Sequence, residues 1–181
     1  DLIVDFGSPY GINVLYNNAR PWIGLHTFSA GPGGIVTGDI DGNGVDDLIV
    51  DFGSPYGINV LYNNARPWTG LHSFSAGPGK MITGDIDGNG VDDLIVDFGS
   101  PYGINVLYNN ARPWTGLHTL SAGPGKMVTG DIDGNRVSDF IVDFDPPYGI
   151  NALYNNGRPW TGLHTLSAGF GGMVTGDADG K

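Results

Sequence analysis

A repeat of 46 residues runs through the whole chain and restricts the folds that it can adopt. Copies begin at Asp1, Asp47, Asp93 and Asp139, and they cover residues 1–46, 47–92, 93–138 and 139–181. The first two copies differ at only five positions, namely Ile23/Thr69, Thr27/Ser73, Gly34/Lys80, Ile35/Met81 and Val36/Ile82. Repeats of about 20–50 residues are typical of solenoids, propellers and arrays, whose units bury their apolar faces against one another. We therefore predict one domain over residues 1–181, built from four equivalent units.

An acidic loop, GDIDGNGVDD in its first copy, recurs in each repeat. Positions one, three, five and nine of this loop are Asp39, Asp41, Asn43 and Asp47, and position seven, Val45, can offer its backbone carbonyl. Calcium takes six to eight oxygen ligands at about 2.3–2.6 Å, from carboxylates, amide and backbone carbonyls and water. The spacing therefore predicts a calcium-binding loop.

The same offsets recur in two further complete loops. Their predicted ligands are Asp85, Asp87, Asn89, Val91 and Asp93, and Asp131, Asp133, Asn135, Val137 and Asp139. An EF-hand is excluded because its loop ends in a Glu and this chain contains no Glu. The alternative is that Asp-Gly and Asn-Gly are ordinary hairpin-turn residues, but three agreeing loops favour calcium. Clustered carboxylates repel one another without a cation, so metal binding and local folding should be coupled.

The composition fits a folded domain and excludes several classes of partner. Hydrophobic residues make up 40% of the chain, which is enough for a core, and the formal net charge is −11. This charge argues against nucleic acid, which requires a basic surface, and against anionic membranes. No apolar run approaches the ~20 residues of a membrane span. Cys is absent, so thiols do not indicate the compartment, but a calcium requirement favours an extracellular or cell-surface location.

Each repeat contains four short strand-like segments separated by Gly and Pro. In the second repeat these segments are 48–52, 58–62, 71–76 and 81–83. No segment shows helical periodicity, and Gly and Pro interrupt the sequence too often for helices. Four strands in each of several repeats of about 40–50 residues describe the blades of a β-propeller. We therefore predict an all-β propeller of four-stranded blades.

The repeat resembles a known family. The unit GDIDGNGVDDLIVDFG, followed by INVLYNN and a Gly-Leu-His segment, is similar to the FG-GAP or VCBS repeat. This repeat occurs in integrin alpha-chain propellers, bacterial surface proteins and fungal propeller lectins of the Psathyrella velutina type. The resemblance implies calcium in a loop between the first and second strands of each blade. The third loop departs from the pattern at Arg136 and Ser138, and the fourth has Lys181 at its fifth position.

The strand order that the resemblance implies places the two chain ends in one blade. The chain then starts at the second strand of a blade and finishes with a first strand at 173–177. We expect the terminal strands to pair and close the ring, or a second chain to complete it. A fourth calcium site would then be divided between Asp177 and Asp179 on one side and Asp1 on the other.

The repetition argues against an enzyme and for a binding protein. A catalytic site needs groups with different pKa values in one asymmetric arrangement, whereas here each His has the same neighbours in sequence. Several equivalent weak sites that engage together raise avidity. We therefore expect no catalytic residues.

The candidate ligand-binding residues are the aromatic, basic and imidazole side chains that recur near the second loop of each repeat. They are Arg20, Trp22, His26, Arg66, Trp68, His72, Arg112, Trp114, His118, Arg158, Trp160 and His164. An aromatic face beside such donors suits a sugar. The alternative is that the Trp side chains pack between blades. A second candidate surface carries Tyr56 and Tyr102, and we expect it on the rim opposite the Trp loops and the calcium loops.

These observations together predict a calcium-stabilised, multivalent carbohydrate-binding protein, or lectin, whose partners are glycans or glycoconjugates. Calcium would be structural rather than a bridge to the sugar. The alternative is an adhesion scaffold that binds a protein partner, as the integrin resemblance allows. No nucleic acid or membrane insertion is expected, and a homo-oligomer is allowed.

Overall fold

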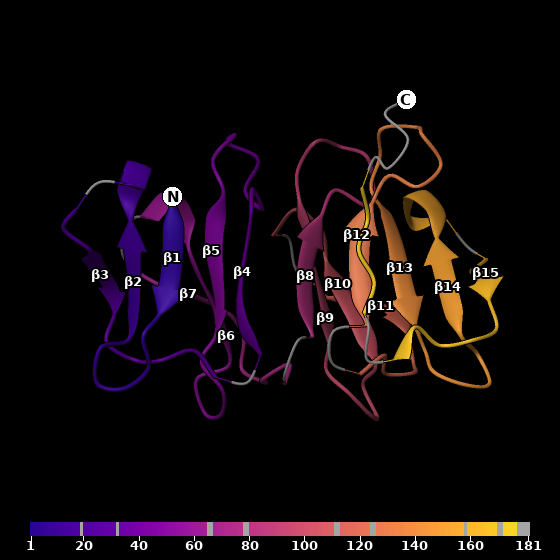
Figure 1. Ribbon diagram of the computed structural model, residues 1–181, viewed down its shortest axis with the longest axis horizontal. Coiled ribbons are helices and arrows are strands. Elements are labelled where there is room, and N and C mark those ends of the chain that lie inside the picture. Colours follow the sequence, from indigo (N-terminus) through magenta and orange to yellow (C-terminus); the bar gives the residue numbers. More distant parts are fainter. Residues whose placement is uncertain are drawn as a thin grey trace.

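The protein consists of four antiparallel β-sheets, one for each sequence repeat (Figure 1). The computed structural model describes residues 1–18, 20–31, 33–64, 67–77, 80–110, 113–123, 126–157, 159–169 and 172–176. The first blade contains β1 (Leu2–Asp5), β2 (Ile12–Leu15) and β3 (Ile23–His26), and the second contains β4 (Gly34–Gly38), β5 (Asp47–Asp51), β6 (Ile58–Leu61) and β7 (Thr69–His72). The third contains β8 (Met81–Gly84), β9 (Asp93–Asp97), β10 (Ile104–Leu107) and β11 (Thr115–His118), and the fourth contains β12 (Met127–Gly130), β13 (Asp139–Asp143), β14 (Ile150–Leu153) and β15 (Thr161–His164).

The predicted all-β fold of blade-like sheets is confirmed. Three blades have four strands in sequential order, and the first blade has three. Among the described residues, the elements outside the strands are four short turns of 3₁₀ type, at Tyr16–Asn18, Tyr62–Asn64, Tyr108–Asn110 and Tyr154–Asn156. Each of these turns follows the third strand of a complete blade, or its equivalent in the first blade, and returns the chain to the outermost strand.

The core lies between successive blades. All five residues of β5 are buried, and the same holds for β9 and β13. Neighbouring side chains of a strand point to opposite faces of its sheet, so Leu48 packs toward the first blade and Ile49 toward the third. A strand that is apolar on both faces is therefore required at the second position of each blade.

A series of hydrogen bonds joins the innermost strands of successive blades. The Thr83 hydroxyl donates to the carbonyl of Thr37 at 2.6 Å, and the Thr129 hydroxyl donates to the carbonyl of Thr83 at 2.7 Å. A Cβ at Gly84 would lie 2.8 Å from the Cβ of Thr129, so only glycine permits this approach. The repeated Thr-Gly pair thus sets the spacing of the blades around the axis.

The predicted ring closure within one chain is not present. In the described residues, β1 pairs only with β2, and residues 172–176 belong to no sheet. The latter segment runs beside β12 (Figure 1), where the Thr175 hydroxyl donates to the carbonyl of Thr129 at 2.7 Å. Although the two segments do not pair, Ile3 of β1 and Met173, Val174 and Thr175 line one cavity of about 770 Å³ together with residues of the inner strands β4, β8 and β12.

Buried carboxylates fix the ends of the second strands. The Asp97 side chain is fully buried, and its Oδ2 accepts from the Ser121 hydroxyl at 2.6 Å and from the Ala122 N–H at 2.9 Å. Its Oδ1 accepts from the Gly99 N–H at 2.8 Å. Asp5, Asp51 and Asp143 accept the equivalent bonds. These residues are therefore structural caps of the turns.

Replacing Asp97 by Ala is expected to destabilise the protein strongly. The change leaves the buried Ala122 N–H and the part-buried Gly99 N–H without their acceptor. Removing one partner from a buried charged network costs about 3 kcal/mol or more. Urea unfolding followed by circular dichroism measures the loss. Asp46→Ala is the control, because Asp46 is exposed and surface changes usually stay within about 0.5 kcal/mol. Equal stabilities of the two variants would contradict the assignment.

Candidate metal centres and ligand groove

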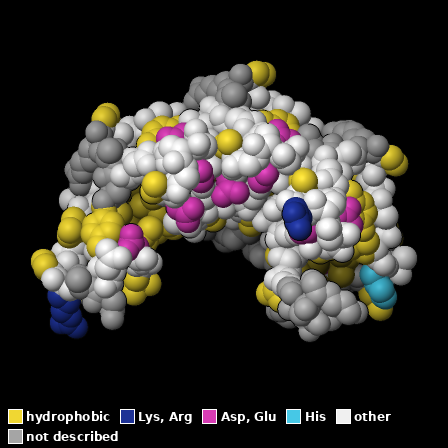
Figure 2. Space-filling model, turned by 90° about the horizontal axis from the view of Figure 1, so that it is seen from above, with side chains coloured by type: hydrophobic (Ala, Val, Ile, Leu, Met, Phe, Trp, Pro, Cys, Tyr) yellow, Lys and Arg dark blue, Asp and Glu magenta, His cyan; other side chains and the backbone are white. Residues whose placement is uncertain are grey.

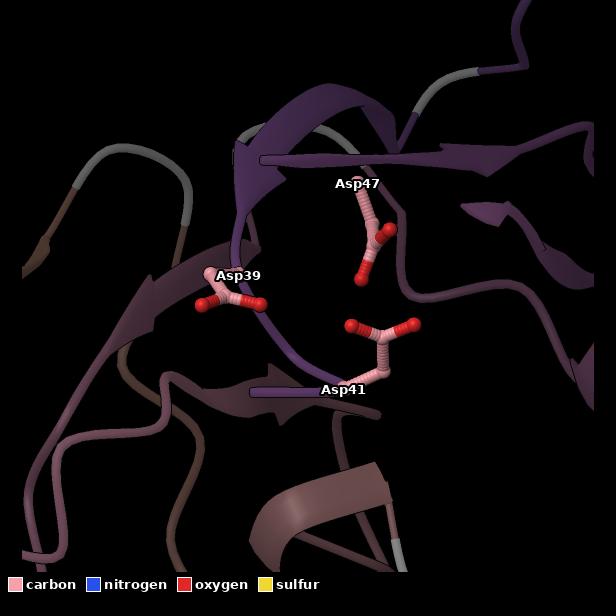
Figure 3. Close-up of side chains that lie close together, drawn as sticks. All are labelled: Asp39, Asp41 and Asp47. Atoms are coloured by element: carbon pink, nitrogen blue, oxygen red, sulfur yellow. The ribbon is translucent and has the colours of Figure 1, made fainter. Parts of the chain in front are cut away.

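Three aspartates from each complete acidic loop converge on one point. In the first loop these are Asp39, Asp41 and Asp47, and each contributes a carboxylate oxygen that lies within 4.8 Å of the other two (Figure 3). Two equivalent clusters consist of Asp85, Asp87 and Asp93, and of Asp131, Asp133 and Asp139. Acidic side chains gather along the concave side of the face that Figure 2 shows. Each of these three groups of oxygens could hold a metal ion.

The first aspartate of each loop holds the loop in its tight turn. The Asp39 carboxylate accepts hydrogen bonds from the N–H groups of Gly42 at 2.9 Å, Asn43 at 3.0 Å and Gly44 at 2.7 Å. Gly42 and Gly44 have φ of 76° and 86°, which glycine adopts without a steric penalty. In the third loop Arg136 takes the position of Gly44 with φ 72°, and its N–H still donates to Asp131 at 2.8 Å. The loop geometry therefore survives this substitution.

The third aspartate comes from the buried strand rather than from the loop. Asp47 begins β5 and is fully buried. Its Oδ1 accepts from the N–H of Asn63 at 3.0 Å, and Asn63 itself has φ 47°, a conformation that Asn tolerates better than most residues. The Asp47 Oδ2 has no hydrogen-bond partner in the described part of the chain. An unpaired, buried carboxylate oxygen that faces two other carboxylates (Figure 3) is expected where a cation binds.

Burial and mutual repulsion disfavour the ionised state of these carboxyls. The pKa of Asp93 is raised to about 7, chiefly by burial. The charges of Asp87 and Asp85 contribute to this rise, and the Asn109 and Ile86 N–H groups oppose it. Burial also raises the pKa of Asp47, with a contribution from Asp41, and the pKa of Asp139. The cluster thus has an excess of negative charge that a bound cation would neutralise.

The donor set fits a hard cation. All three groups supply oxygen ligands only, which suits Ca²⁺, Mg²⁺ or Mn²⁺ rather than softer metals. Two ligands at about 2.3–2.6 Å from one ion can be at most about 5 Å apart, and the observed carboxylate oxygens satisfy this limit with 4.8 Å.

The other predicted ligands have different contacts. The Asn43 Oδ1 accepts from the N–H of Val45 at 2.9 Å, and its amide group donates to Asp41. Asn89 and Asn135 accept equivalent bonds from Val91 and Val137. The amide oxygens therefore stabilise the loop in this structure, and metal contacts of the amides and of the Val carbonyls stay predictions.

Sequence reasoning missed the contacts between neighbouring loops. The N–H of Asp92 donates to the carbonyl of Asp39 at 2.9 Å, and the N–H of Asp39 donates to the Asp92 carboxylate at 3.1 Å. A Cβ at Gly42 would lie 2.8 Å from a methyl group of Val91. The metal loops of adjacent blades therefore interlock, so that ordering one loop also orders the next.

The predicted fourth site is described only in part. The Asp1 Oδ1 accepts from the N–H of Asn17 at 3.0 Å, as Asp47 accepts from Asn63, so Asp1 has the local geometry of a ninth-position aspartate. Asp177 and Asp179 lie outside the described residues, and the division of this site between them and Asp1 stays a prediction.

A groove between the second and third blades brings together residues from both predicted ligand surfaces. It has a volume of about 830 Å³ and is lined by Tyr56, Gly70, Leu71, His72, Ser73, Pro113 and Trp114. The rings of His72 and Trp114 meet edge to face at 5.5 Å. The pairs His26–Trp68 and His118–Trp160 repeat this contact at the other two junctions. The ligand-binding candidates of the Trp loops thus meet across blade boundaries.

The expectation that the Tyr turns and the Trp loops lie on opposite rims stays a prediction, but Tyr56 and Trp114 line the same groove. Trp114 is half-buried and packs against Phe98 of its own blade at 5.5 Å. The Trp114 indole N–H is buried and has no partner among the described residues. Tyr56 and Tyr102 are each 57% exposed.

The imidazoles have a defined tautomer. The Nδ1 atom of His72 accepts from the N–H of Phe74 at 3.0 Å, and His26, His118 and His164 accept the equivalent bond. In the neutral ring the proton is therefore on Nε2.

The remaining candidates lie at the ends of the arc or outside the described residues. Trp22 packs on Phe6 at 5.2 Å, and His164 and Arg20 are exposed. Arg66, Arg112 and Arg158 lie outside the described residues, so the predicted role of the guanidinium groups stays a prediction.

Comparisons with known proteins identify no relative of this chain. No protein-family model, curated protein or solved structure matches the chain. Among the described residues, no helix has the length and apolar character needed to cross a membrane.

The stability of the metal-free protein should fall as pH rises. The pKa of the Asp93 carboxyl is about 7 in the folded state and near its ordinary value of 3.8 in the unfolded state. The folded state therefore binds this proton more tightly than the unfolded state does. Its stability should therefore decrease between about pH 4 and pH 7 as this proton is lost. Urea midpoints in EDTA at pH 4.5, 6 and 7.5 measure the effect.

The Asp93→Asn variant is the control for this titration. The histidines contribute equally to the pH dependence of stability of the variant and of the unmodified protein, so the difference between the two proteins reports Asp93. The difference in stability between the variant and the unmodified protein should grow in favour of the variant as pH rises. A difference that is constant with pH would contradict the assignment.

Proposed function

We propose that this chain is a calcium-stabilised, multivalent carbohydrate-binding protein that acts outside the cell or at its surface. The observation that carries the proposal is the repetition of two features at each blade junction. One is a cluster of three carboxylates, and the other is an aromatic–imidazole pair in a groove between blades. The FG-GAP or VCBS resemblance of the repeat agrees with the first feature, because it implies calcium in this loop.

Calcium is the favoured cation because the loop is rich in oxygen ligands and carries several negative charges. Calcium accepts six to eight oxygens in irregular geometry, whereas Mg²⁺ requires a near-ideal octahedron. In the first loop, the ion would join Asp39 and Asp41 of the loop to Asp47 of β5. When bound, the ion would supply the positive charge that offsets the three carboxylates. The Asp47 carboxylate fixes this region against the Asn63 turn, because it accepts the Asn63 N–H. The role of the ion is structural.

Calcium should stabilise the unmodified protein and should stabilise Asp93→Asn less. In EDTA, Asp93→Asn relieves the repulsion between Asp93 and the other two carboxylates of its cluster. The same change removes a carboxylate ligand and therefore weakens one of the three calcium sites. We expect the thermal midpoint to rise on adding millimolar calcium, with a smaller rise for Asp93→Asn than for the control Asp46→Asn. Asp46 is exposed and lies outside the three clusters.

Differential scanning calorimetry with and without calcium measures both midpoints. A midpoint of the unmodified protein that EDTA and calcium leave unchanged would contradict calcium binding.

The groove at His72 and Trp114 has the chemistry of a sugar site. Sugars present a C–H face that packs on aromatic rings and hydroxyls that need hydrogen-bond partners. Tyr56 offers an exposed ring and hydroxyl, and His72 contributes an imidazole whose Nε2 is protonated in the neutral form. The groove volume of about 830 Å³ falls within the range of ligand sites.

The third junction lacks an exposed aromatic side chain that the first two carry. Phe28 packs on Tyr56 at 5.3 Å, and Phe74 packs on Tyr102 at 5.4 Å. At the third junction Leu120 takes the place of the Phe, so the aromatic pair is lost beside Tyr148. The first two junctions therefore present the larger aromatic surface and should bind a sugar more tightly.

Removing the exposed Tyr side chains should weaken glycan binding while leaving the fold intact. Tyr56→Ala with Tyr102→Ala removes the Tyr56 ring from the groove beside Trp114 and removes the partner rings of Phe28 and Phe74. A lost aromatic contact of about 1.4 kcal/mol lowers affinity ~10-fold. A glycan array identifies the sugar, and haemagglutination inhibited by millimolar monosaccharide measures the effect. Val45→Ala is the control, because Val45 is similarly exposed but lies in a metal loop.

A folded, calcium-loaded protein that binds no glycan on the array and agglutinates no cells would contradict the carbohydrate proposal. That result would favour the adhesion scaffold, in which the same exposed aromatic rings would contact a protein partner.

A further inference from the structure

The Lys and Arg residues of the chain differ in how accessible the peptide bond after them is to a protease. A trypsin-like protease takes Arg or Lys in an anionic pocket. It cuts poorly before proline, because the proline ring is bonded to the nitrogen that has to leave. Arg136 is followed by Val137 and lacks this protection, whereas the other four Arg residues each precede a proline, namely Arg20, Arg66, Arg112 and Arg158.

The two lysines in the described part of the chain are held by carboxylates. The Lys80 ammonium lies 3.4 Å from the Asp97 Oδ2 and donates to the Ser121 hydroxyl at 3.0 Å, and Lys126 pairs with Asp145. Their side chains are 15% and 19% exposed, and each lysine directly precedes the buried Met of an inner strand. Lys181 lies outside the described residues.

Arg136 lies in the third metal loop, inside the segment that one carboxylate cluster spans. Asp131 and Asp133 precede it and Asp139 follows it, and these three aspartates form the cluster. Residues 131–136 are all exposed, and exposed loop tips are preferred sites of proteolytic nicking. Among the described residues, Arg136 is therefore the basic residue that a protease reaches most easily.

The closed loop itself does not fit a protease. Proteases bind a substrate in an extended conformation, in which φ is about −120 to −140°, whereas φ of Arg136 is 72°. The Asp131 carboxylate also accepts the N–H groups of Gly134 at 2.7 Å, Asn135 at 3.1 Å and Arg136 at 2.8 Å. The loop has to open before the bond after Arg136 can be cut.

The third loop should open more readily than the other two. A left-handed backbone is unfavourable for Arg because of its Cβ, whereas Gly44 and Gly90 adopt it without strain in the other loops. The Asp92 carboxylate accepts the N–H of Asp39 and so ties the second loop to the first. Ser138 takes the place of this aspartate in the third loop and has no carboxylate for such a bond. Both departures from the repeat weaken the closed form.

We propose that the bond between Arg136 and Val137 is a regulated cleavage site for trypsin-like proteases, open to them when the third loop is metal-free and protected when the loop holds calcium. The protection rests on the proposed function, whereas the identity of the bond does not. Cleavage adds one water: the C–N bond breaks, the Arg136 carbonyl carbon becomes a carboxylate, and the Val137 nitrogen becomes an ammonium group. The cut divides the third cluster, because Asp131 and Asp133 stay on one fragment and Asp139 on the other.

Limited digestion with trypsin in EDTA tests the identity of the bond. Denaturing electrophoresis and mass spectrometry should show residues 1–136 and 137–181 as the first products, and the chain has no Cys that would join them. The cut after Arg136 should be at least ~10-fold faster than the cuts after Lys80 and Lys126, as expected of local rather than global opening. Equal rates at the three residues would overturn the proposal.

Two variants of Arg136 check the same assignment. Arg136→Gly restores the residue of the other two loops, and glycine adopts this φ without strain, so the fold should tolerate the change. This variant should resist trypsin in EDTA while the unmodified protein is cut, and Arg136→Lys should still be cut at the same bond. Unchanged digestion of Arg136→Gly, or resistance of Arg136→Lys, would overturn the assignment.

The same digestion in ~10 mM calcium tests the protection, because extracellular modules bind calcium at about 0.1–1 mM. Calcium should slow the cut after Arg136 at least ~10-fold, since the cleavage rate follows the population of the open loop. Asp133→Asn should lose most of this protection. Asp87→Asn, the equivalent change in the second cluster, is the matched control and should keep it. Hydrolysis of a small arginine ester in both buffers corrects for any effect of calcium on trypsin.

Two outcomes separate the protection from calcium binding itself. An equal rate of cleavage with and without calcium, in a protein whose thermal midpoint calcium raises, would overturn the protection and leave the calcium proposal intact. An equal rate together with an unchanged midpoint would overturn both.

Discussion

A carboxylate at the start of a fully buried strand is the constraint on which this structure depends. Asp47 and its equivalents begin strands that are apolar on both faces, and burial opposes their ionisation. The acidic loop brings two further carboxylates to the same point. A cation at this point would resolve the conflict between burial and charge. Because the loop backbones bond across blades, a cation bound to one blade would also stabilise its junction with the next.

The same junction produces the other functional features. The packing of the second blade on the third places His72 beside Trp114, and both residues line one groove. The other two junctions repeat the His–Trp pair. The carboxylate clusters and the aromatic–imidazole pairs thus depend on one repeated interface.

The sequence predicts what depends on contacts within a repeat. The 46-residue period predicts the blades, and the spacing of Asp39, Asp41 and Asp47 predicts their convergence, because loop geometry is local. Contacts between repeats were not predictable in the same way. The turn from blade to blade decides whether β1 and residues 173–176 pair, which they do not, and it brings Tyr56 and Trp114 into one groove. This turn depends on packing such as the Thr83 bond to Thr37, which no single repeat encodes. The hydrogen bond from Val45 to Asn43 likewise could not be read from ligand spacing.

The most direct test of the account is crystallographic. Crystals grown with calcium, measured at a wavelength where calcium scatters anomalously, should show one anomalous peak within each cluster, coordinated by carboxylate oxygens at about 2.3–2.6 Å. The account predicts peaks beside Asp47, Asp93 and Asp139. Maps without an ion at any of these positions, in a protein whose loops are otherwise as described, would contradict it.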